Sequence, residues 1–181
     1  MKKEESKETE LLLEVGTEII EATPPTVGRL LETKKRHSER MIFIHEYMQA
    51  LLPDNFPGMS TTEVVAYDSM SCLDTKRITQ YMDIDLREYS FMPGLINHLM
   101  KKQRSETRQG LLSFKGPNFF PIIDKRGLLC FVKLWWKGSL FGGSRDAWHQ
   151  WWFFSHNELP TPSIDLQENS RLFLAFPVPE I

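Results

Sequence analysis

The chain has 181 residues, of which 41% are hydrophobic and 25% are charged, and such a composition is typical of a soluble globular protein. This length favours one domain with a substantial core over two domains. The formal net charge of −2 is far from the strongly basic balance of a dedicated duplex-DNA binder. Cys72 and Cys130 are too few and too far apart for a disulfide framework or a CxxC metal site, so we expect a reducing, cytoplasmic setting.

The N-terminal residues carry most of the negative charge. Residues 1–22 hold three lysines and seven glutamates, a net of −4, which leaves +2 for the rest of the chain. We expect residues 1–8 to form a disordered charged tail and residues 9–181 to form a single domain. No apolar stretch is long enough to span a bilayer.

Apolar residues at helical spacing predict that the first half of the chain is mainly helical. Leu12, Val15 and Ile19 recur at this spacing, and a Pro-Pro pair ends the helix that they indicate. Ser60 and Glu63 match a capping box, which favours a short helix from that point. The predicted helices cover residues 10–22, 27–52, 60–70 and 93–109.

One strand is expected inside this helical half. From Ile78 to Arg87 the residues alternate strictly between two faces, which is typical of a strand with one buried side. Asp83 and Asp85 would then lie about 7 Å apart on the polar face, where two carboxylates can hold Mg²⁺. Outward acidic residues are common on such strands, so we assign no metal and no other cofactor.

After Gly110 the pattern changes to that of β-strands. Apolar runs between turn residues predict strands over residues 111–114, 118–123, 128–137, 147–154 and 171–176. A turn is predicted at Asp124–Gly127. We therefore expect an α+β fold in which a helical N-terminal half packs on a C-terminal antiparallel β-sheet. Its helices lie mainly in residues 10–109, with one strand at 78–87, and its other strands lie mainly in residues 111–176.

All five tryptophans lie in two apolar runs that flank Gly142 and Gly143. A Gly-Gly pair between strand-like runs is typical of a tight hairpin turn. In the register centred on these glycines, Trp136 faces His149, and side chains alternate between the two faces of the hairpin. The face expected in the core consists of Val132, Leu134, Trp136, Trp151 and Phe153.

The opposite face of this hairpin alternates aromatic and cationic side chains. Lysines and tryptophans there lie within cross-strand reach, and a cation over an indole contributes about 0.5–1 kcal/mol when exposed. Such a face can bind a partner's side chains or stack bases, unless a helix of the same protein covers it. Leu140 and Phe141, at the hairpin tip, would bury little within their own domain. The predicted interaction surface consists of Phe131, Lys133, Trp135, Lys137, Leu140, Phe141, Trp148, Gln150 and Trp152.

This surface favours a non-enzymatic interaction or assembly module, a subunit of a larger complex that binds another protein or itself. One alternative is a single-stranded nucleic-acid binder that uses the Lys/Trp face and basic helices near residues 34–40 and 101–108, although the overall acidity argues against it. A second alternative is a metal-dependent enzyme of unknown reaction. No P-loop, GxSxG or HExxH motif identifies a catalytic residue, and His149 and His156 form no recognisable zinc-ligand set.

Overall fold

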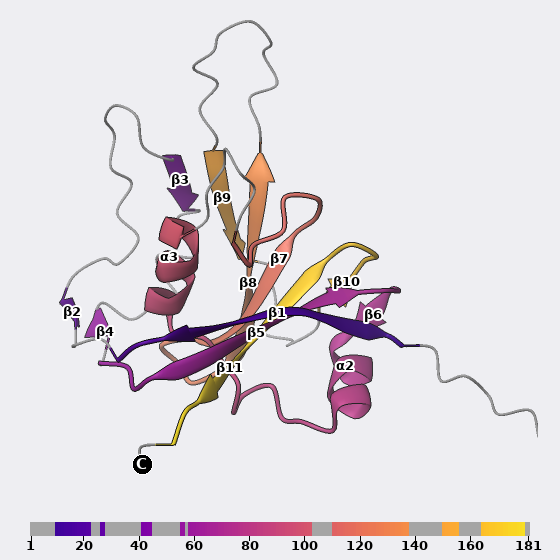
Figure 1. Ribbon diagram of the computed structural model, residues 1–181, viewed down its shortest axis with the longest axis horizontal. Helices are drawn as coiled ribbons and strands as arrows, with labels where there is room; N and C mark the ends of the chain where they lie inside the picture. The colour runs from indigo at the N-terminus through magenta and orange to yellow at the C-terminus, as the bar shows by residue number, and fades with distance from the viewer. Residues whose placement is uncertain are drawn as a thin grey trace, which may run out of the picture.

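The computed structural model shows a protein built mainly from β-strands (Figure 1). It describes residues 10–22, 26–27, 41–44, 55–56, 58–102, 110–137, 150–155 and 164–179. The strands are β1 (Leu12–Ile20), β2 (Thr26–Val27), β3 (Met41–Ile44), β4 (Asn55–Phe56), β5 (Thr62–Ser69), β6 (Leu73–Asp74), β7 (Asn118–Ile123), β8 (Leu129–Lys137), β9 (Gln150–Ser155), β10 (Asp165–Leu166) and β11 (Arg171–Pro177). The helices among the described residues are α2 (Thr75–Met82) and α3 (Pro93–Lys102).

Seven of these strands form one sheet, in the order β1-β5-β11-β7-β8-β9-β3. Neighbouring strands are antiparallel, except for the parallel pairs β11–β7 and β3–β9. The β11–β7 contact is short, because only Arg171↔Asn118 and Leu172↔Phe119 are paired. Figure 1 shows the consequence: β1 and β5 lie across the view, β11 lies obliquely, and β8 and β9 rise steeply away from β1 and β5.

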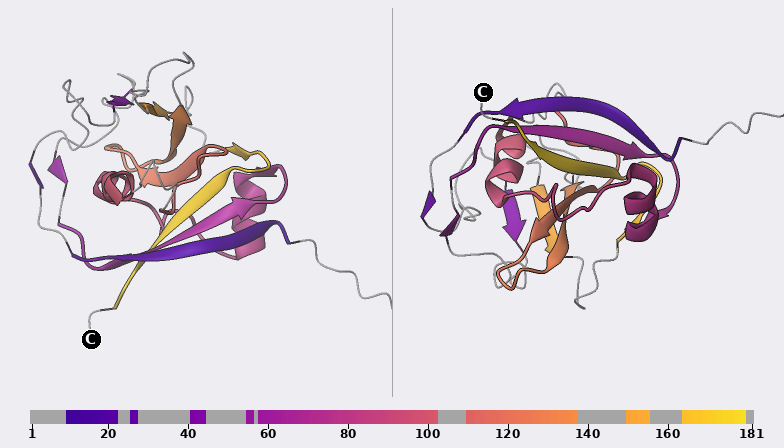
Figure 2. Two further views of the ribbon diagram at one scale, coloured as in Figure 1. Left: turned by 45° about the horizontal axis from the view of Figure 1, so that its top comes forward. Right: turned by 90° about the horizontal axis from the view of Figure 1, so that it is seen from below.

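Both faces of the sheet are covered by packed side chains. On one face, Leu95, Ile96 and Leu99 of α3 pack into a cluster with Phe120 and Phe173 of the sheet. A second cluster on the other face joins α2 and the β6–β10 pair to the sheet. Its buried members include Ile78, Leu73, Leu166, Phe131 and Leu172. Figure 2 shows the two helices on opposite sides of the strands.

The expected helical N-terminal half packed on a sheet is wrong, because residues 10–22 and 60–70 contain strands β1 and β5. β5, with the sequence TEVVAYDS, lies between β1 and β11. It therefore has a neighbouring strand at each edge and packed side chains on both faces. Such a central strand shows a continuous apolar run in place of an alternation. The β-branched Thr62, Val64 and Val65 also favour an extended backbone. The capping-box pattern at Ser60 was therefore misleading.

The strand predicted over residues 78–87 is also wrong, because its first part belongs to helix α2. Ile78 and Met82 are four residues apart, a spacing that places two side chains on one face in a helix and in a strand alike. The start of α2 is fixed by Asp74, whose carboxylate accepts a hydrogen bond from the Arg77 N–H at 2.7 Å. This N-cap satisfies one of the free donors of the first turn. Asp83 ends the helix with a left-handed backbone, φ 53°.

The remaining predicted elements agree with the structure more closely. Helix α3 and strands β7, β8 and β11 are confirmed, and β9 occupies the described part of the predicted strand 147–154. Residues 111–114 form bends instead of a strand. Within the expected helix 27–52, the described residues are Val27, which belongs to strand β2, and Met41–Ile44, which form strand β3. The rest of that segment, residues 103–109 and the expected tail 1–8 lie outside the described residues.

The buried carboxylate of Asp124 organises the turn between β7 and β8, which lies where the sequence predicts a turn, at Asp124–Gly127. Asp124 Oδ1 accepts the N–H groups of Arg126 at 2.8 Å and Leu128 at 2.9 Å. Its Oδ2 accepts Nε of Arg126 at 2.9 Å. Gly127 closes the turn with φ 78°, a conformation that glycine adopts without strain. Burial alone would raise the pKa of Asp124, but these hydrogen bonds and the Arg126 charge lower it below its ordinary value.

Asp124→Asn should therefore reduce stability by about 1–2 kcal/mol at neutral pH, because the Nδ2 group that takes the place of Oδ2 cannot accept a hydrogen bond from the Arg126 guanidinium. A lowered folded-state pKa means that the stabilisation is present above the unfolded pKa, about 3.9, and is lost as pH falls through the folded value. Urea unfolding of the parent and the variant at several pH values measures this. The difference in unfolding free energy between the parent and the variant should be constant near neutral pH and should vanish in strong acid. A pH-independent difference would contradict the assigned role of the carboxylate.

Candidate interaction surface

The described part of β8 contributes to both sides of the core. Cys130, Val132 and Leu134 lie in the α3-side cluster, as predicted for the apolar face of this strand. Burial, followed by the nearby Asp124 charge, raises the pKa of the Cys130 thiol to about 11, which is the behaviour expected of an inert buried thiol. Phe131 points to the other face, where it is 1% exposed within the α2-side cluster. It is therefore part of the core and is not available to a partner.

β8 and β9 pair antiparallel in a register that differs by two residues from the predicted one. Trp136 pairs with Trp151, not His149, and Lys137 pairs with Gln150. A shift of two residues preserves the faces, because side chains alternate with a period of two. Trp135, Lys137, Gln150 and Trp152 of the predicted surface therefore occupy one face of this strand pair by register. The turn glycines and three other predicted residues, Leu140, Phe141 and Trp148, lie outside the described residues.

Lys133 is the predicted surface residue whose side chain the structure describes most fully. It is half-buried, and its ammonium lies 5.6 Å from the centroid of the Phe119 ring. Phe119 itself is buried in the α2-side cluster. Burial lowers the pKa of Lys133. The side chain thus lies along the core with its charged end over an aromatic ring, in the manner of a snorkelling lysine.

The edge strand β1 is a surface feature that the sequence patterns did not indicate. Among the described residues β1 pairs with β5 alone, and in the right-hand view of Figure 2 it forms the outermost strand of the sheet. Three large apolar side chains on it are exposed: Leu13 at 40%, Val15 at 38% and Ile19 at 62%. An edge strand presents a row of N–H and C=O groups that can pair with another chain.

A β-bulge at Val15 divides β1 into two parts. The pairing with β5 shifts by one residue between Glu14 and Gly16, so one extra residue reverses the face to which later side chains point. Leu12 therefore packs in the α2-side cluster, whereas Ile20 packs in the α3-side cluster. A Cβ on Gly16 would lie 2.7 Å from Leu111 Cδ2, so the glycine permits close packing next to the bulge.

The second part of β1 is tied to helix α3 by an ion pair. Lys102 Nζ lies 2.6 Å from Glu18 Oε1, and His98 Nε2 lies 3.4 Å from the same oxygen. The Glu18 side chain is 18% exposed. Glu18 points toward α3, so Thr17 and Ile19, its neighbours along the strand, point to the opposite face.

The surroundings of this edge are acidic. The segment between Lys7 and Arg29 contains five glutamates and no lysine, arginine or histidine. Of these glutamates, Glu10, Glu14 and Glu21 are exposed. On β5, burial raises the pKa of Tyr67, and the charges of Glu14 and Glu63 raise it further.

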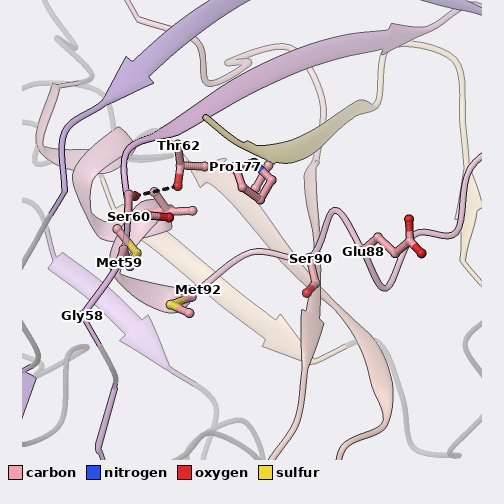
Figure 3. A pocket seen from close by; sticks show the side chains of 10 residues that line it. Gly58, Met59, Ser60, Thr62, Glu88, Ser90, Met92 and Pro177 are labelled. Carbon is pink, nitrogen blue, oxygen red and sulfur yellow. Dashed lines mark hydrogen bonds between the residues drawn. The ribbon is translucent and has the colours of Figure 1, made fainter. Parts of the chain in front are cut away.

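A small pocket lies where β5 begins and β11 ends, next to the first turn of α3 (Figure 3). Its volume of about 180 Å³ is below the range of roughly 300–1,000 Å³ typical of small-molecule sites. Met59, Ser60 and Thr62 line one side of it, and Glu88 and Ser90 lie toward the other (Figure 3). The Thr62 hydroxyl donates to the Ser60 carbonyl at 3.0 Å. This size fits a small group or water, and we assign no ligand to the pocket.

The candidate metal ligands of the sequence are not placed as expected. Asp83 and Asp85 follow helix α2 and do not share a strand face; Asp85 Oδ1 accepts the Arg87 N–H at 3.0 Å. Within the described ranges no group of three or more His, Cys, Asp or Glu side chains is arranged to hold a metal ion. His149 and His156 lie outside these ranges.

Neither of the two described helices has the length and apolar character needed to cross a membrane. Comparison of the chain with protein-family models, with curated proteins and with solved structures finds no match.

Proposed function

We propose that the protein is a non-enzymatic interaction module, a subunit of a larger cytoplasmic assembly, that binds another polypeptide along the edge of β1 that has no partner strand among the described residues. One observation carries the proposal. Six large apolar side chains are exposed among the described residues, and three of them, Leu13, Val15 and Ile19, lie on this one edge strand. Isolated exposed apolar residues need no explanation, but a group of them on one element is typical of a binding surface.

Strand addition explains why these residues lie on an edge. An extended segment that pairs with β1 forms main-chain hydrogen bonds with the N–H and C=O groups along its outer edge, and side chains of the segment cover the neighbouring apolar residues. Nine residues in β1 are more than the usual strand length of about five or six. The edge is therefore long enough to define the position of a bound segment.

The β8–β9 face remains a second part of this proposal. By register, Trp135 and Lys137 of β8 share a face with Trp152 and Gln150 of β9, and the tip residues Leu140 and Phe141 follow in the sequence. The single-stranded nucleic-acid alternative has less support, because Lys133 is one of the cations that it uses, and the half-buried position of that ammonium over Phe119 does not suit phosphate binding.

The double variant Leu13→Lys with Ile19→Lys should keep the fold and abolish binding of the native partner. Charged residues on an edge strand oppose pairing with another chain, and we expect at least a tenfold loss of partner retained by the tagged full-length protein in a quantitative pull-down. A matched control is Tyr81→Lys with Leu128→Lys, which makes the same chemical change at two exposed apolar sites away from the edge.

A third variant, Leu140→Ser with Phe141→Ser, distinguishes the two surfaces. Loss of the partner in this variant, with normal binding by the β1 variant, would assign the interaction to the hairpin tip. If the β1 variant and the control retain the partner equally, strand addition at β1 is rejected. Circular dichroism and thermal unfolding of each variant show whether the fold is intact.

A further inference from the structure

We infer that the segment bound by β1 is an extended strand from a different polypeptide, with an apolar residue opposite Ile19 and a lysine or arginine four residues away, opposite Glu14. The inference rests on the proposed function and names the chemistry of its partner. It follows from the position of the bulge, from the faces to which side chains of the edge point, and from the charges along it.

The bulge determines where a new strand can pair without a break. Gly16–Ile20 pairs with β5 in an unshifted register, from Gly16↔Ala66 to Ile20↔Thr62. Bulges and charges are common protections of edge strands, and on β1 the bulge precedes this regular part. The regular part also carries Ile19, the most exposed large apolar side chain among the described residues, at 62%.

The faces of β1 fix which partner residues lie together. Because of the bulge, Glu14, Thr17 and Ile19 all point to the α2 side of the sheet. On β5, the residues that pair with Ile19 and Glu14 are Glu63 and Tyr67, four positions apart. A strand on the other edge of β1 that follows the same geometry has this same spacing, so one of its faces presents both the apolar and the basic residue.

The charges along β1 determine which type of partner residue fits opposite Glu14. Glu14 is exposed, and the Thr17 hydroxyl donates to its Oε1 at 3.3 Å. Glu18, by contrast, is bound to Lys102. Glu10 and Glu21 extend the negative charge beyond both ends of the pairing region. A cationic residue opposite Glu14 forms a favourable cross-strand pair, and a basic segment is attracted to such an edge over a longer range.

The same charges argue against a second copy of this chain as the occupant. In an antiparallel pair of the regular parts of two β1 strands, Gly16–Ile20, Thr17 of one copy lies opposite Ile19 of the other, and the two Glu18 residues lie opposite each other. Like charges directly opposite one another destabilise a strand pair. The acidic residues beyond each end of the strand would add further repulsion between the two copies.

Three short threonine-rich peptides test the inference by NMR titration of the full-length protein. Each has one valine and, four residues further on, a lysine, a glutamate or a glutamine. We expect the lysine peptide to bind roughly fivefold more tightly than the glutamine peptide, as one cross-strand ion pair allows, and the glutamate peptide to bind most weakly. In Glu14→Gln the difference between lysine and glutamine should disappear, whereas it should persist in the matched control Glu88→Gln.

The outcomes separate this inference from the proposed function. Equal binding of all three peptides, lost in Leu13→Lys with Ile19→Lys, would retain strand addition and overturn the charge preference. Absence of binding by every peptide at millimolar concentration would reject strand addition itself. Light scattering of the protein alone adds a further test, because a dimer that is lost in the same double variant would assign the edge to a second copy.

Discussion

Phe173→Ala should lower the free energy of unfolding by about 3–5 kcal/mol, the cost of removing a large aromatic side chain from a close-packed core. Phe173 lies on β11 and is 0% exposed. Its ring stacks on Phe120 at a centroid distance of 4.7 Å and meets the edge of Phe91 at 6.4 Å. These contacts join β11, β7 and the segment that leads into α3. Urea unfolding followed by tryptophan fluorescence measures the loss.

Two variants calibrate this result. Phe173→Leu keeps most of the buried volume and should cost clearly less than the alanine variant. Phe176→Ala removes the same side chain from a half-buried position beside Tyr89, so it should also cost less. Losses of similar size at positions 173 and 176 would contradict the packing of the α3-side cluster described above.

The sequence predicted the C-terminal strands well because their signals are local. NFFPII and LCFVKLWW are apolar runs separated by a turn that Asp124 and Gly127 organise through contacts within a few residues. The same runs misled the assignment of faces. Alternation was expected to separate a core face from an exposed one, whereas residues of both parities, such as Phe131 and Val132, are buried. A strand in a sheet covered on both sides loses the alternation.

The N-terminal strands were missed for a different reason. Leu12, Val15 and Ile19 match a helical spacing, but a bulge in an edge strand produces an irregular spacing of the same kind, because it adds one residue between two alternating segments. The partner strand β5 lies more than forty residues along the chain, with Leu12 paired to Ser69. No local pattern specifies such a pairing.

The candidate surface was predictable only in part. A face shared by Trp135, Lys137 and Trp152 follows from alternation alone, and the β8–β9 pairing agrees with it. The edge of β1 could not be found, since its exposure depends on the order of strands in the sheet. One signal was present in the sequence: the run of glutamates without a nearby cation is more typical of a solvent-exposed edge than of a buried element.

Asn118→Asp should be about as damaging as the loss of the core phenylalanine, because Asn118 is 0% exposed and its amide holds three segments together. Oδ1 accepts the Ser113 N–H at 2.7 Å, and Nδ2 donates to the carbonyls of Ser113 at 3.0 Å and Leu134 at 3.2 Å. An aspartate places a carboxylate oxygen against both carbonyls. A buried charge left uncompensated in this way costs about 3–5 kcal/mol.

The pH dependence of the unfolding free energy distinguishes the effect of a buried charge at position 118 from the effect of losing the asparagine's hydrogen bonds and packing alone. Burial beside two carbonyls raises the folded-state pKa of the introduced carboxyl group above its unfolded value of about 3.9. The protonated acid regains a hydrogen-bond donor. The loss of unfolding free energy in Asn118→Asp should therefore be smallest below the unfolded pKa and should grow as pH rises through the folded pKa. Asn118→Leu has no titrating group, and its deficit relative to the parent should not change with pH. Equal pH profiles for the two variants would contradict the assigned hydrogen bonds.

The position of Asn118 predicts which part of the sheet fails first. It begins β7 at the point where β7 meets β11 through only two residue pairs, so little else in the backbone joins β7 and β8 to β1, β5 and β11. The five antiparallel pairs from Gly16↔Ala66 to Ile20↔Thr62 do not depend on it. Amide hydrogen exchange of Asn118→Asp should therefore show loss of protection in β7 and β8 before β1 and β5. If β1 stays paired with β5 in this variant, a peptide should still bind along the edge of β1 although the β8–β9 face is weakened. Peptide titration of Asn118→Asp therefore compares the two surfaces within one protein.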